Sequence, residues 1–315
     1  MKLIVYHIFC VGDYQNIVKS QIEKVKKSGL YDWCDVMEIT CVDTEEKFEG
    51  IDEIFHGMDK VNIFKTKLNA FEYWGIKKIW DIAQTNDGQV FYFHSKGVSN
   101  TYTNLITKEI SEWKVQGINI WRNALEFHLI DNYQKCLEDL NDHDTCGMTC
   151  VGNWIWGNFW WANLSFVREN QDPVHGDRWY FEAWLHFARH YKTKEYHHFE
   201  WNPYFSDLPI EAYYNSEFFI NKKVEIVSAH FGTIGIQQDE GYPSEIPVQQ
   251  FDVTDKVIEN FNNNNKEFIN ISVNTEILGE PIHGMRKFLV MLIKLDDIIY
   301  RITYNEGFTV GLKFN

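Results

Sequence analysis

The sequence predicts an α/β domain built on a parallel sheet, followed by a small all-β domain. Three features lead to this fold class: a strand–helix–strand pattern at the start, the unbroken apolar run Val90–Phe93, and short alternating runs near the end. A strand that is apolar on both faces is typical of a parallel sheet. Short strands between turn signals are typical of a sandwich. We place the boundary near residue 222, giving domains 1–221 and 222–315.

The first elements predict a βαβ unit. Leu3–Cys10 is expected to be a strand, Tyr14–Val25 an amphipathic helix that Gly29 ends, and Val36–Val42 a second strand. A βαβ unit favours a right-handed crossover and parallel pairing. Asp43 closes the second strand, where a carboxylate suits a ribose hydroxyl or a base edge. A solvated aspartate at a strand end is the alternative.

Helices are expected before and after the central strand in the sequence. Lys67–Ala83 has apolar residues on one face, and Leu105–Leu140 predicts a long helical region divided near Gly117. Beyond about Val224 helical periodicity is no longer evident. Four short strands are expected there, at Phe268–Val273, Lys287–Leu295, Ile298–Tyr304 and Thr309–Phe314.

Composition excludes several classes of function. The net charge of -15 argues against general binding to nucleic acid or to an anionic membrane surface. The 6 cysteines form no CxxC pair, which predicts buried free thiols in a reducing compartment. With neither a signal peptide nor an apolar run long enough to span a membrane, we expect the protein in a reducing, cytoplasm-like compartment.

The central strand ends in His94, Ser95, Lys96 and Gly97. Ligands of open α/β sheets bind beyond the carboxyl ends of the strands, so these groups are suited to an anionic ligand. An ordinary polar turn is the alternative. Neither a Gly-x-Gly-x-x-Gly motif after the first strand nor a P-loop occurs, which removes the main support for dinucleotide redox chemistry and P-loop hydrolysis.

Two aromatic stretches follow the central strand. Residues 147–162 include Trp154, Trp156, Trp160 and Trp161, which indicates either aromatic walls around a pocket or a strand pair in an aromatic core. The stretch 177–185 is expected to enter a helix. Glu182 would then lie near the positive end of that helix and stay ionised, as a general base requires.

Three motifs in order resemble a GT-A type glycosyltransferase over roughly residues 1–205. They are the Phe-His-Ser-Lys-Gly-Val element at 93–98, Gly-Asn-Phe-Trp-Trp-Ala at 157–162, and Arg-Trp-Tyr-Phe-Glu-Ala-Trp at 178–184. More narrowly, they are similar to predicted sugar transferases from bacterial polysaccharide loci and large DNA viruses.

The C-terminal part contains Ser-Ala-His-Phe-Gly at 228–232, Phe-Asp-Val-Thr-Asp at 251–255, and Gly-Glu-Pro at 279–281 followed by Lys-Phe-Leu at 287–289. Through these pieces it weakly resembles a small β domain appended to other proteins. Acceptor or glycan binding, oligomerisation and scaffolding are its alternative roles.

The resemblance implies a hexosyl- or deoxyhexosyltransferase that uses a nucleotide-diphosphate sugar as donor. It also implies a bacterial or viral-host cytoplasm as the compartment. The wider fold holds a divalent metal, Mn²⁺ or Mg²⁺, with an Asp-x-Asp after the central strand, and here His94-Ser95-Lys96 occupies that place. A lysine can neutralise a phosphate without metal. Alternatively, His94 is one ligand of a metal held by carboxylates from elsewhere. The slight preference is for chemistry with weak or no metal dependence.

The implied roles of the site residues fall into three groups. Glu182 takes the proton of an acceptor hydroxyl, which gives inversion as a working hypothesis. The donor and its diphosphate are assigned to His94, Ser95, Lys96, Gly97, Asp43 and Glu72, and the sugar or acceptor to Asn158, Trp160, Trp161, Arg178 and Trp184. The main alternative is a lectin-like carbohydrate-binding protein without chemistry. A glycoside hydrolase and a nucleotidyltransferase are further alternatives.

Overall fold

The computed structural model describes residues 1–98, 108–148, 150–151, 154–187, 191–215, 217–239, 242–283 and 285–314. Contacts divide the chain into two compact units. Unit 1 comprises Met1–Ser99 and Ala124–His198, and unit 2 comprises Asn100–Asn123 and Phe199–Asn315. The domain boundary near residue 222 stays a prediction. In the described part of the chain, no helix has the length and apolar character needed to cross a membrane.

Unit 1 contains a seven-stranded sheet in the order β3-β2-β1-β4-β8-β5-β9. Its strands are β1 (Lys2–Phe9), β2 (Val36–Val42), β3 (Val61–Thr66), β4 (Gln89–His94), β5 (Thr145–Gly147), β8 (Trp160–Asn163) and β9 (Thr193–Glu195). The pairs β1–β2, β2–β3, β1–β4 and β5–β9 are parallel, whereas β8 is antiparallel to β4 and β5. The predicted α/β class with a largely parallel sheet is confirmed.

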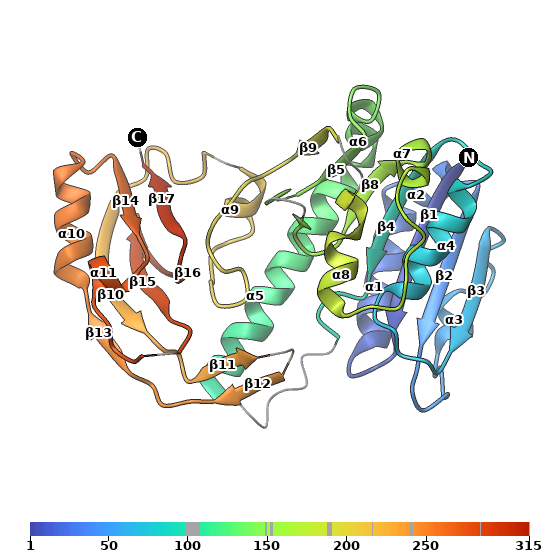
Figure 1. Ribbon diagram of the computed structural model, residues 1–315. Coiled ribbons are helices and arrows are strands. Elements are labelled where there is room, and N and C mark those ends of the chain that lie inside the picture. Colours follow the sequence, from blue (N-terminus) through green and yellow to red (C-terminus); the bar gives the residue numbers. More distant parts are fainter. Residues whose placement is uncertain are drawn as a thin grey trace. The chain divides into compact units, whose positions relative to one another are not determined.

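The strand order reverses beside β1. The chain runs outward from β1 through β2 to β3 and then returns to place β4 on the other side of β1 (Figure 1). In open α/β sheets such a reversal opens a crevice at the carboxyl ends of the two strands, and ligands bind there. The carboxyl ends of β1 and β4 are therefore the place in this sheet where a ligand is expected.

Helices and short turns surround this sheet. Those of unit 1 are α1 (Tyr14–Lys27), α2 (Leu30–Trp33), α3 (Ile51–Ile54), α4 (Tyr73–Ala83), the π-helix η2 (Phe127–Asp131), α6 (Tyr133–Asp139), α7 (Leu164–Arg168), α8 (Arg178–Ala183) and the 3-10 turn η3 (Trp184–Phe187). The hairpin of β6 (Cys150–Val151) and β7 (Trp154–Ile155) precedes β8. Helix α5 (Lys108–Glu126) contains the division between the two units.

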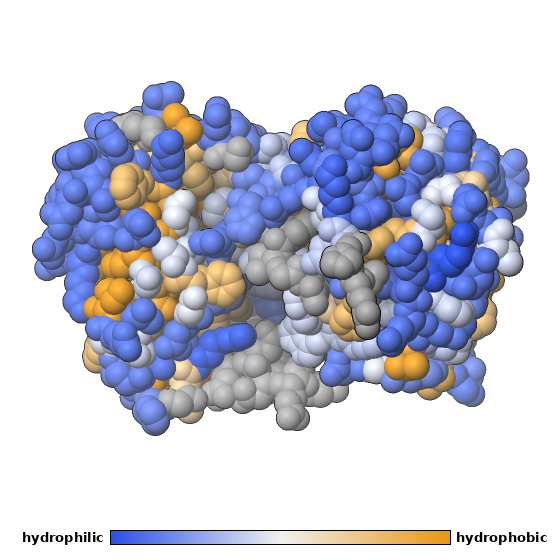
Figure 2. All heavy atoms as spheres, turned by 45° about the horizontal axis from the view of Figure 1, so that its top comes forward, coloured by the Kyte–Doolittle hydropathy of each residue, from blue (hydrophilic) through white to orange (hydrophobic). Residues whose placement is uncertain are grey.

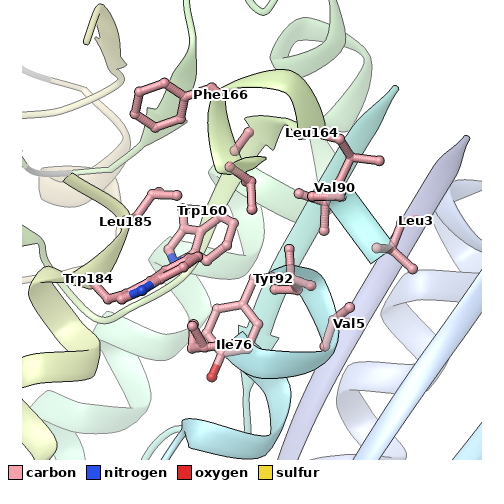
Figure 3. Close-up of a cluster of buried hydrophobic side chains, with 14 of the residues drawn as sticks. Leu3, Val5, Ile76, Val90, Tyr92, Trp160, Leu164, Phe166, Trp184 and Leu185 are labelled. Atoms are coloured by element: carbon pink, nitrogen blue, oxygen red, sulfur yellow. The ribbon is translucent and has the colours of Figure 1, made fainter. Parts of the chain in front are cut away.

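The strand β4 is buried on both faces because its side chains alternate between two apolar layers. Val90 and Tyr92 pack with Ile76, Trp160 and other residues of α4, α7 and α8 in one layer (Figure 3). On the opposite face, the ring of Phe93 stacks on that of Tyr6 at 4.1 Å. This two-sided burial explains the unbroken apolar sequence of the strand.

The predicted helix 67–83 begins later than expected, at Tyr73. The hydroxyl of Thr66 accepts a hydrogen bond from the backbone N–H of Leu68, and the side chain of Asn69 accepts one from Phe71. Such local bonds compete with helix formation. Phe71 also has a left-handed φ of 53°, so the segment before Tyr73 forms a turn and not a helix.

The long helical region does not divide at Gly117, because α5 continues through it. A Cβ at Gly117 would lie only 2.3 Å from the carbonyl oxygen of Pro203. This glycine therefore permits close backbone packing within unit 2. The interruption comes later, at η2, before α6 begins.

Unit 2 contains an antiparallel sheet in the order β13-β10-β15-β16. Its strands are β10 (Val224–Gly232), β13 (Gln250–Asp252), β15 (Phe288–Leu295) and β16 (Ile298–Asn305), and two further pairs are β11 (Ile236–Asp239) with β12 (Tyr242–Glu245) and β14 (Phe268–Ser272) with β17 (Thr309–Lys313). The expected β region near the C-terminus is present, with antiparallel pairing, and its four predicted strands are β14 to β17.

The C-terminal region is not all β, contrary to the prediction. It includes α10 (Thr254–Asn263) and α11 (Thr275–Leu278), and α9 (Glu211–Tyr214) precedes it. Helix α10 buries Val257 and Phe261, which are spaced four residues apart as a helix face requires.

On the face drawn in Figure 2, hydrophilic residues predominate and hydrophobic ones form scattered patches.

Gly75 provides a test of how α4 packs on the sheet. A Cβ there would lie 2.9 Å from Cε2 of Tyr92 and 3.3 Å from Cβ of His7. We expect Gly75→Ala to lower the free energy of unfolding by about 1–2 kcal/mol, since overpacking outweighs the better helix propensity of alanine.

Urea unfolding of Gly75→Ala checks this packing, with Gly311→Ala as the matched control. An added Cβ at Gly311 meets only the Glu200 carboxylate, at 3.9 Å. Equal stability of the two variants would contradict close packing of α4 on Tyr92.

Candidate functional site

The candidate site lies where β1 and β4 end side by side. His94 is paired with His7 across the two strands. The backbone N–H of Ser95 donates to the carbonyl of His7 at 3.0 Å, and the hydroxyl of Ser95 accepts from the N–H of Phe9 at 3.0 Å. Ser95 thereby fixes the turn to β1, and Gly97 follows with a φ of 93° that favours glycine. These bonds give Ser95 a structural task.

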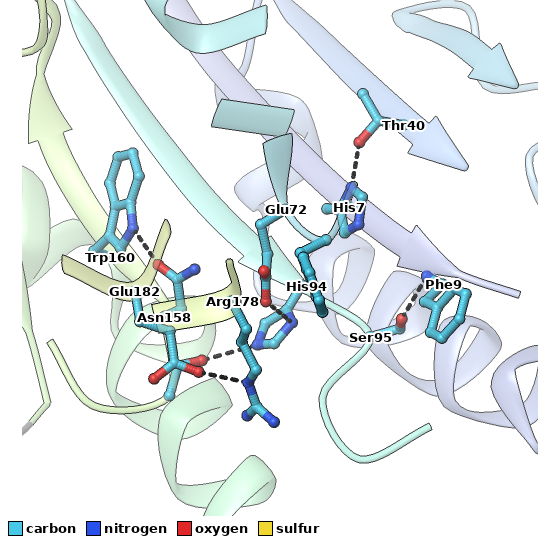
Figure 4. Close-up of polar contacts among 12 residues, drawn as sticks. His7, Phe9, Thr40, Glu72, His94, Ser95, Asn158, Trp160, Arg178 and Glu182 are labelled. Atoms are coloured by element: carbon cyan, nitrogen blue, oxygen red, sulfur yellow. Dashed lines mark hydrogen bonds and ion pairs between the residues drawn. The ribbon is translucent and has the colours of Figure 1, made fainter. Parts of the chain in front are cut away.

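The imidazole of His94 is held in one tautomer. Its Nε2 lies 2.9 Å from the carbonyl oxygen of Gly157, and since a carbonyl only accepts, Nε2 carries the hydrogen. Its Nδ1 faces Oε1 of Glu72 at 3.8 Å (Figure 4). Burial, followed by the positive charges of Lys96 and Arg178, holds the pKa of His94 well below its usual range. His94 is therefore neutral at physiological pH.

Glu72 is the most perturbed carboxyl of the site. It lies at the start of α4, and only 8% of it is exposed. Burial, followed by the negative charge of Glu182, raises its pKa from 4.5 to about 7. Arg178 and Lys96 act in the opposite direction. Near neutral pH, Glu72 is therefore divided between its protonated and ionised forms.

Glu182 forms an ion pair with Arg178, at 3.0 Å between Oε1 and Nε. It is the fifth residue of α8, which runs from Arg178 to Ala183. The prediction that Glu182 lies at the helix start was wrong, because Asp177 caps that end by accepting the N–H of Tyr180 at 2.8 Å. The favourable field of a helix N-terminus falls off within the first turn. Arg178, and not the helix N-terminus, is therefore the positive group that Glu182 contacts.

Lys96 and Glu182 belong to one cluster. Both act electrostatically on the carboxyl of Glu72, and Lys96 acts on the imidazole of His94 as well. Lys96 is only 5% exposed, so its charge lies in a weakly solvated place where electrostatic effects are strong. The fold thus brings two cations and two carboxyls together from sequence positions far apart.

The three indoles assigned to a sugar pocket lie in the hydrophobic core. Trp160 packs against Tyr92 at 5.0 Å between ring centroids, and Trp161 faces the opposite layer, stacked on Phe91 at 5.0 Å. Trp184 is likewise fully buried. The alternative of an aromatic core, left open by the sequence, describes these rings. No ring face of the three is open to a ligand in this structure.

Asn158 differs from these indoles because it joins the polar cluster. Its Oδ1 accepts from Nε1 of Trp160 at 3.0 Å, which fixes the orientation of the amide. Its φ of 52° is left-handed, a conformation that asparagine tolerates better than most residues. Gly157 beside it also has a positive φ, of 85°. Two consecutive left-handed residues thus hold a carbonyl on His94 and an amide beside it.

Asp43 has a local structural task. Its two carboxylate oxygens accept backbone N–H groups of Glu45, Lys47 and Phe48 at 2.9, 3.1 and 2.8 Å. These bonds close the turn after β2. A role for Asp43 in holding a ribose stays a prediction.

The donor set does not fit a metal held by several carboxylates. Across the described residues, no group of three or more His, Cys, Asp or Glu side chains is arranged to hold a metal ion. Nε2 of His94 is occupied by the Gly157 carbonyl, and the carboxylate of Asp43 is occupied by backbone N–H groups. We therefore derive no step that passes through a metal.

Tyr92 is the polar residue of this cluster that sequence reasoning missed. It stands inside the apolar run of β4, where tyrosine is easily counted as one more core ring. Burial, followed by the charges of Glu72 and Glu182, raises its pKa well above the usual range. The only available signal was the hydroxyl itself, two residues before His94 in a strand that carries polar groups at its end.

Comparisons with known proteins give no family. No protein-family model and no curated protein matches the chain. Among solved structures, it resembles HddC from Yersinia pseudotuberculosis, with a TM-score of 0.37 and 10% identity over 63% of this chain and 91% of that one. It also resembles 4-diphosphocytidyl-2C-methyl-D-erythritolsynthase from Anaerococcus prevotii, with a TM-score of 0.35 and 9% identity over 63% and 90%. Likeness at these values assigns no activity to this chain.

The raised pKa of Glu72 predicts a pH-dependent stability. Between pH 4.5 and about 7 the unfolded state releases this proton while the folded state keeps it, so the contribution of Glu72 falls as pH rises. The total loss is roughly 3 kcal/mol at about 1.4 kcal/mol per unit of pKa shift. We expect wild type to lose free energy of unfolding relative to Glu72→Gln across this window.

Urea unfolding over this pH range measures the difference between the two proteins. Burial lowers the pKa of His7 from 6.5 to about 4, so His7 makes stability rise with pH in the same range. Both proteins contain His7, and its effect therefore cancels in the comparison. In Glu182→Gln the loss of stability should end at a lower pH than in wild type, because this variant lacks a charge that raises the pKa of Glu72. A difference between wild type and Glu72→Gln that stays constant with pH would show that Glu72 titrates normally.

Proposed function

We propose that unit 1 transfers a sugar from a nucleotide-diphosphate donor to an acceptor hydroxyl of a glycan. The observation that carries this proposal is the convergence of Lys96, Arg178, Glu72 and Glu182 at the reversal point of a parallel sheet. A buried cation, Lys96, with a second, more exposed one, Arg178, suits a diphosphate, and a carboxylate beside them suits a proton acceptor. The resemblance of the three sequence motifs to GT-A type glycosyltransferases supports the same function.

In this proposal, Lys96 stabilises the departing diphosphate as a point charge. Neutral His94, with its hydrogen on Nε2 directed at Gly157, offers Nδ1 to the site as an acceptor. Arg178 is the more exposed of the two cations, and it orients Glu182 through their ion pair. The positive charge therefore lies both deep in the cluster and at its more exposed side.

Glu182 is the proposed base. The acceptor oxygen forms a bond to the anomeric carbon as its proton passes to the carboxylate of Glu182. The bond from that carbon to the diphosphate oxygen breaks, and its electron pair leaves with the diphosphate. A single displacement of this kind inverts the anomeric centre. A lectin-like protein would bind the sugar without these bond changes and would not need a cation for a diphosphate.

Replacement of the base separates chemistry from binding. We expect Glu182→Gln to lower kcat for sugar transfer about 10²- to 10⁴-fold, since it removes the proton acceptor. Affinity for the nucleotide sugar should stay within a few-fold of wild type. Initial rates with UDP-, GDP- and dTDP-sugars, with binding measured by calorimetry, check both expectations. Full turnover of the variant would remove Glu182 from the mechanism.

Replacement of the lysine tests the diphosphate contact. We expect Lys96→Met to weaken binding of UDP, GDP or dTDP about 10- to 100-fold, the usual effect of losing a charged hydrogen bond, and to leave binding of the free nucleoside unchanged.

The control is Lys78→Met, on the exposed side of α4, where Lys78 lies 3.5 Å from Glu38. If wild type responds to free glycans and to none of the nucleoside diphosphates, the lectin-like alternative replaces the proposed function.

A further inference from the structure

Three polar atoms of the site are buried and have no partner among the described residues. They are Oε2 of Glu72, the hydroxyl of Tyr92 and Nδ2 of Asn158. The three side chains are 8%, 0% and 2% exposed. A buried polar group without a hydrogen bond is costly, so each such group in a folded protein calls for an explanation.

The three atoms belong to one neighbourhood. The charge of Glu72 acts on the hydroxyl of Tyr92, and the ring of Tyr92 packs against Trp160 at 5.0 Å. The indole Nε1 of Trp160 in turn donates to Asn158. Because this bond engages Oδ1 of Asn158, the unpartnered Nδ2 is a donor in a fixed orientation. His94 connects the two sides, with Glu72 near Nδ1 and Gly157 at Nε2 (Figure 4).

We propose that Glu72, Tyr92 and Asn158 form a subsite that binds hydroxyl groups of the transferred sugar. This inference rests on the proposed function and names the part of the site that recognises the sugar. The three groups supply an amide donor, a hydroxyl that donates or accepts, and a carboxyl. Sugar hydroxyls both donate and accept, so adjacent hydroxyls of one ring satisfy all three. The ionised form of Glu72 would repel a phosphate, whereas a sugar hydroxyl can bond to either form of the carboxyl.

The surroundings of Glu72 favour a neutral ligand at this subsite. Its carboxyl faces Glu182 and Arg178 from α8, Lys96 from the turn after β4, and His94 and Tyr92 from β4. The negative charge of Glu182 and the burial of the group both oppose ionisation of Glu72. An uncharged polyol adds no further charge to this balance. The two cations remain available for the diphosphate.

Tyr92→Phe tests the subsite, because it removes only the unpartnered hydroxyl and keeps the ring that packs on Trp160. The quantity to measure is the sugar gain, defined as the Kd of the nucleoside diphosphate divided by the Kd of its sugar conjugate. UDP, GDP and dTDP are compared with their glucose, mannose and rhamnose conjugates by calorimetry. We expect Tyr92→Phe to lower the gain about 3- to 10-fold and to leave the Kd of the diphosphate unchanged.

Tyr6→Phe is the matched control. Tyr6 is equally buried, in the neighbouring strand β1, but its hydroxyl donates to Oε1 of Gln21 at 2.6 Å. Tyr6→Phe should lower the Tm and keep the sugar gain. Tyr92→Phe should not lower the Tm of the ligand-free protein, since it breaks no bond to another described side chain.

The outcomes separate the two proposals. An unchanged sugar gain in a folded Tyr92→Phe variant would overturn the subsite and leave the transferase proposal standing. If wild type binds none of the nucleoside diphosphates, the transferase proposal fails. The same variants are then compared by saturation-transfer NMR with methyl glycosides. Loss of their signals in Tyr92→Phe alone would support the subsite as part of a glycan-binding protein, and equal or absent signals in all three proteins would overturn it.

Discussion

The removal of water from the carboxyl of Glu72 is the constraint on which the rest of the site depends. Its burial beside Glu182 places two carboxyls near one another, and the resulting repulsion is offset by Lys96 and Arg178. His94 is buried as well, and this burial, followed by the charge of Lys96, holds its pKa well below the usual range and keeps it neutral. In water these charges would be screened and would act almost independently. In the folded protein, the pKa of Glu72 and the pKa of His94 therefore depend on the charges around them.

This arrangement follows from the path of the chain through the sheet. Because β4 is buried on both faces, its backbone has little freedom, and the residues after it leave the sheet at a fixed point beside β1. Ser95 ties that point to β1, and Gly157 ties His94 to the turn before β8. Helix α8 then supplies Arg178 and Glu182 from a distant part of the sequence. Rigid elements thus hold the charged groups in place.

Much of the fold was predictable because it depends on local patterns. The apolar run of β4, the βαβ opening and the alternating strands near the end each bury a face that the sequence displays directly. The late start of α4 was not predictable from periodicity, because the side chains of Thr66 and Asn69 compete for the backbone ahead of it. The continuity of α5 through Gly117 depends on a distant carbonyl, that of Pro203.

The site was only partly predictable, for a related reason. His94 and Lys96 follow a recognisable strand, so their place at its carboxyl end could be inferred from sequence. We expected Glu182 at a helix N-terminus, but α8 begins four residues earlier, at Arg178, and Glu182 forms an ion pair with that residue. The sequence pattern did not fix the exact start of this short helix. Trp160 and Trp161 could not be assigned to core or pocket, since composition does not say which side of a ring is covered. The role of Tyr92 depends on which hydroxyls lack a partner, which only the folded structure shows.

The most direct test of the central claim is a crystal structure of the protein with a nucleotide-diphosphate sugar, soaked with Mn²⁺. The account predicts a diphosphate in contact with Lys96 and a sugar between Lys96 and Glu182. A nucleotide sugar bound elsewhere on the protein, with both residues untouched, would contradict it.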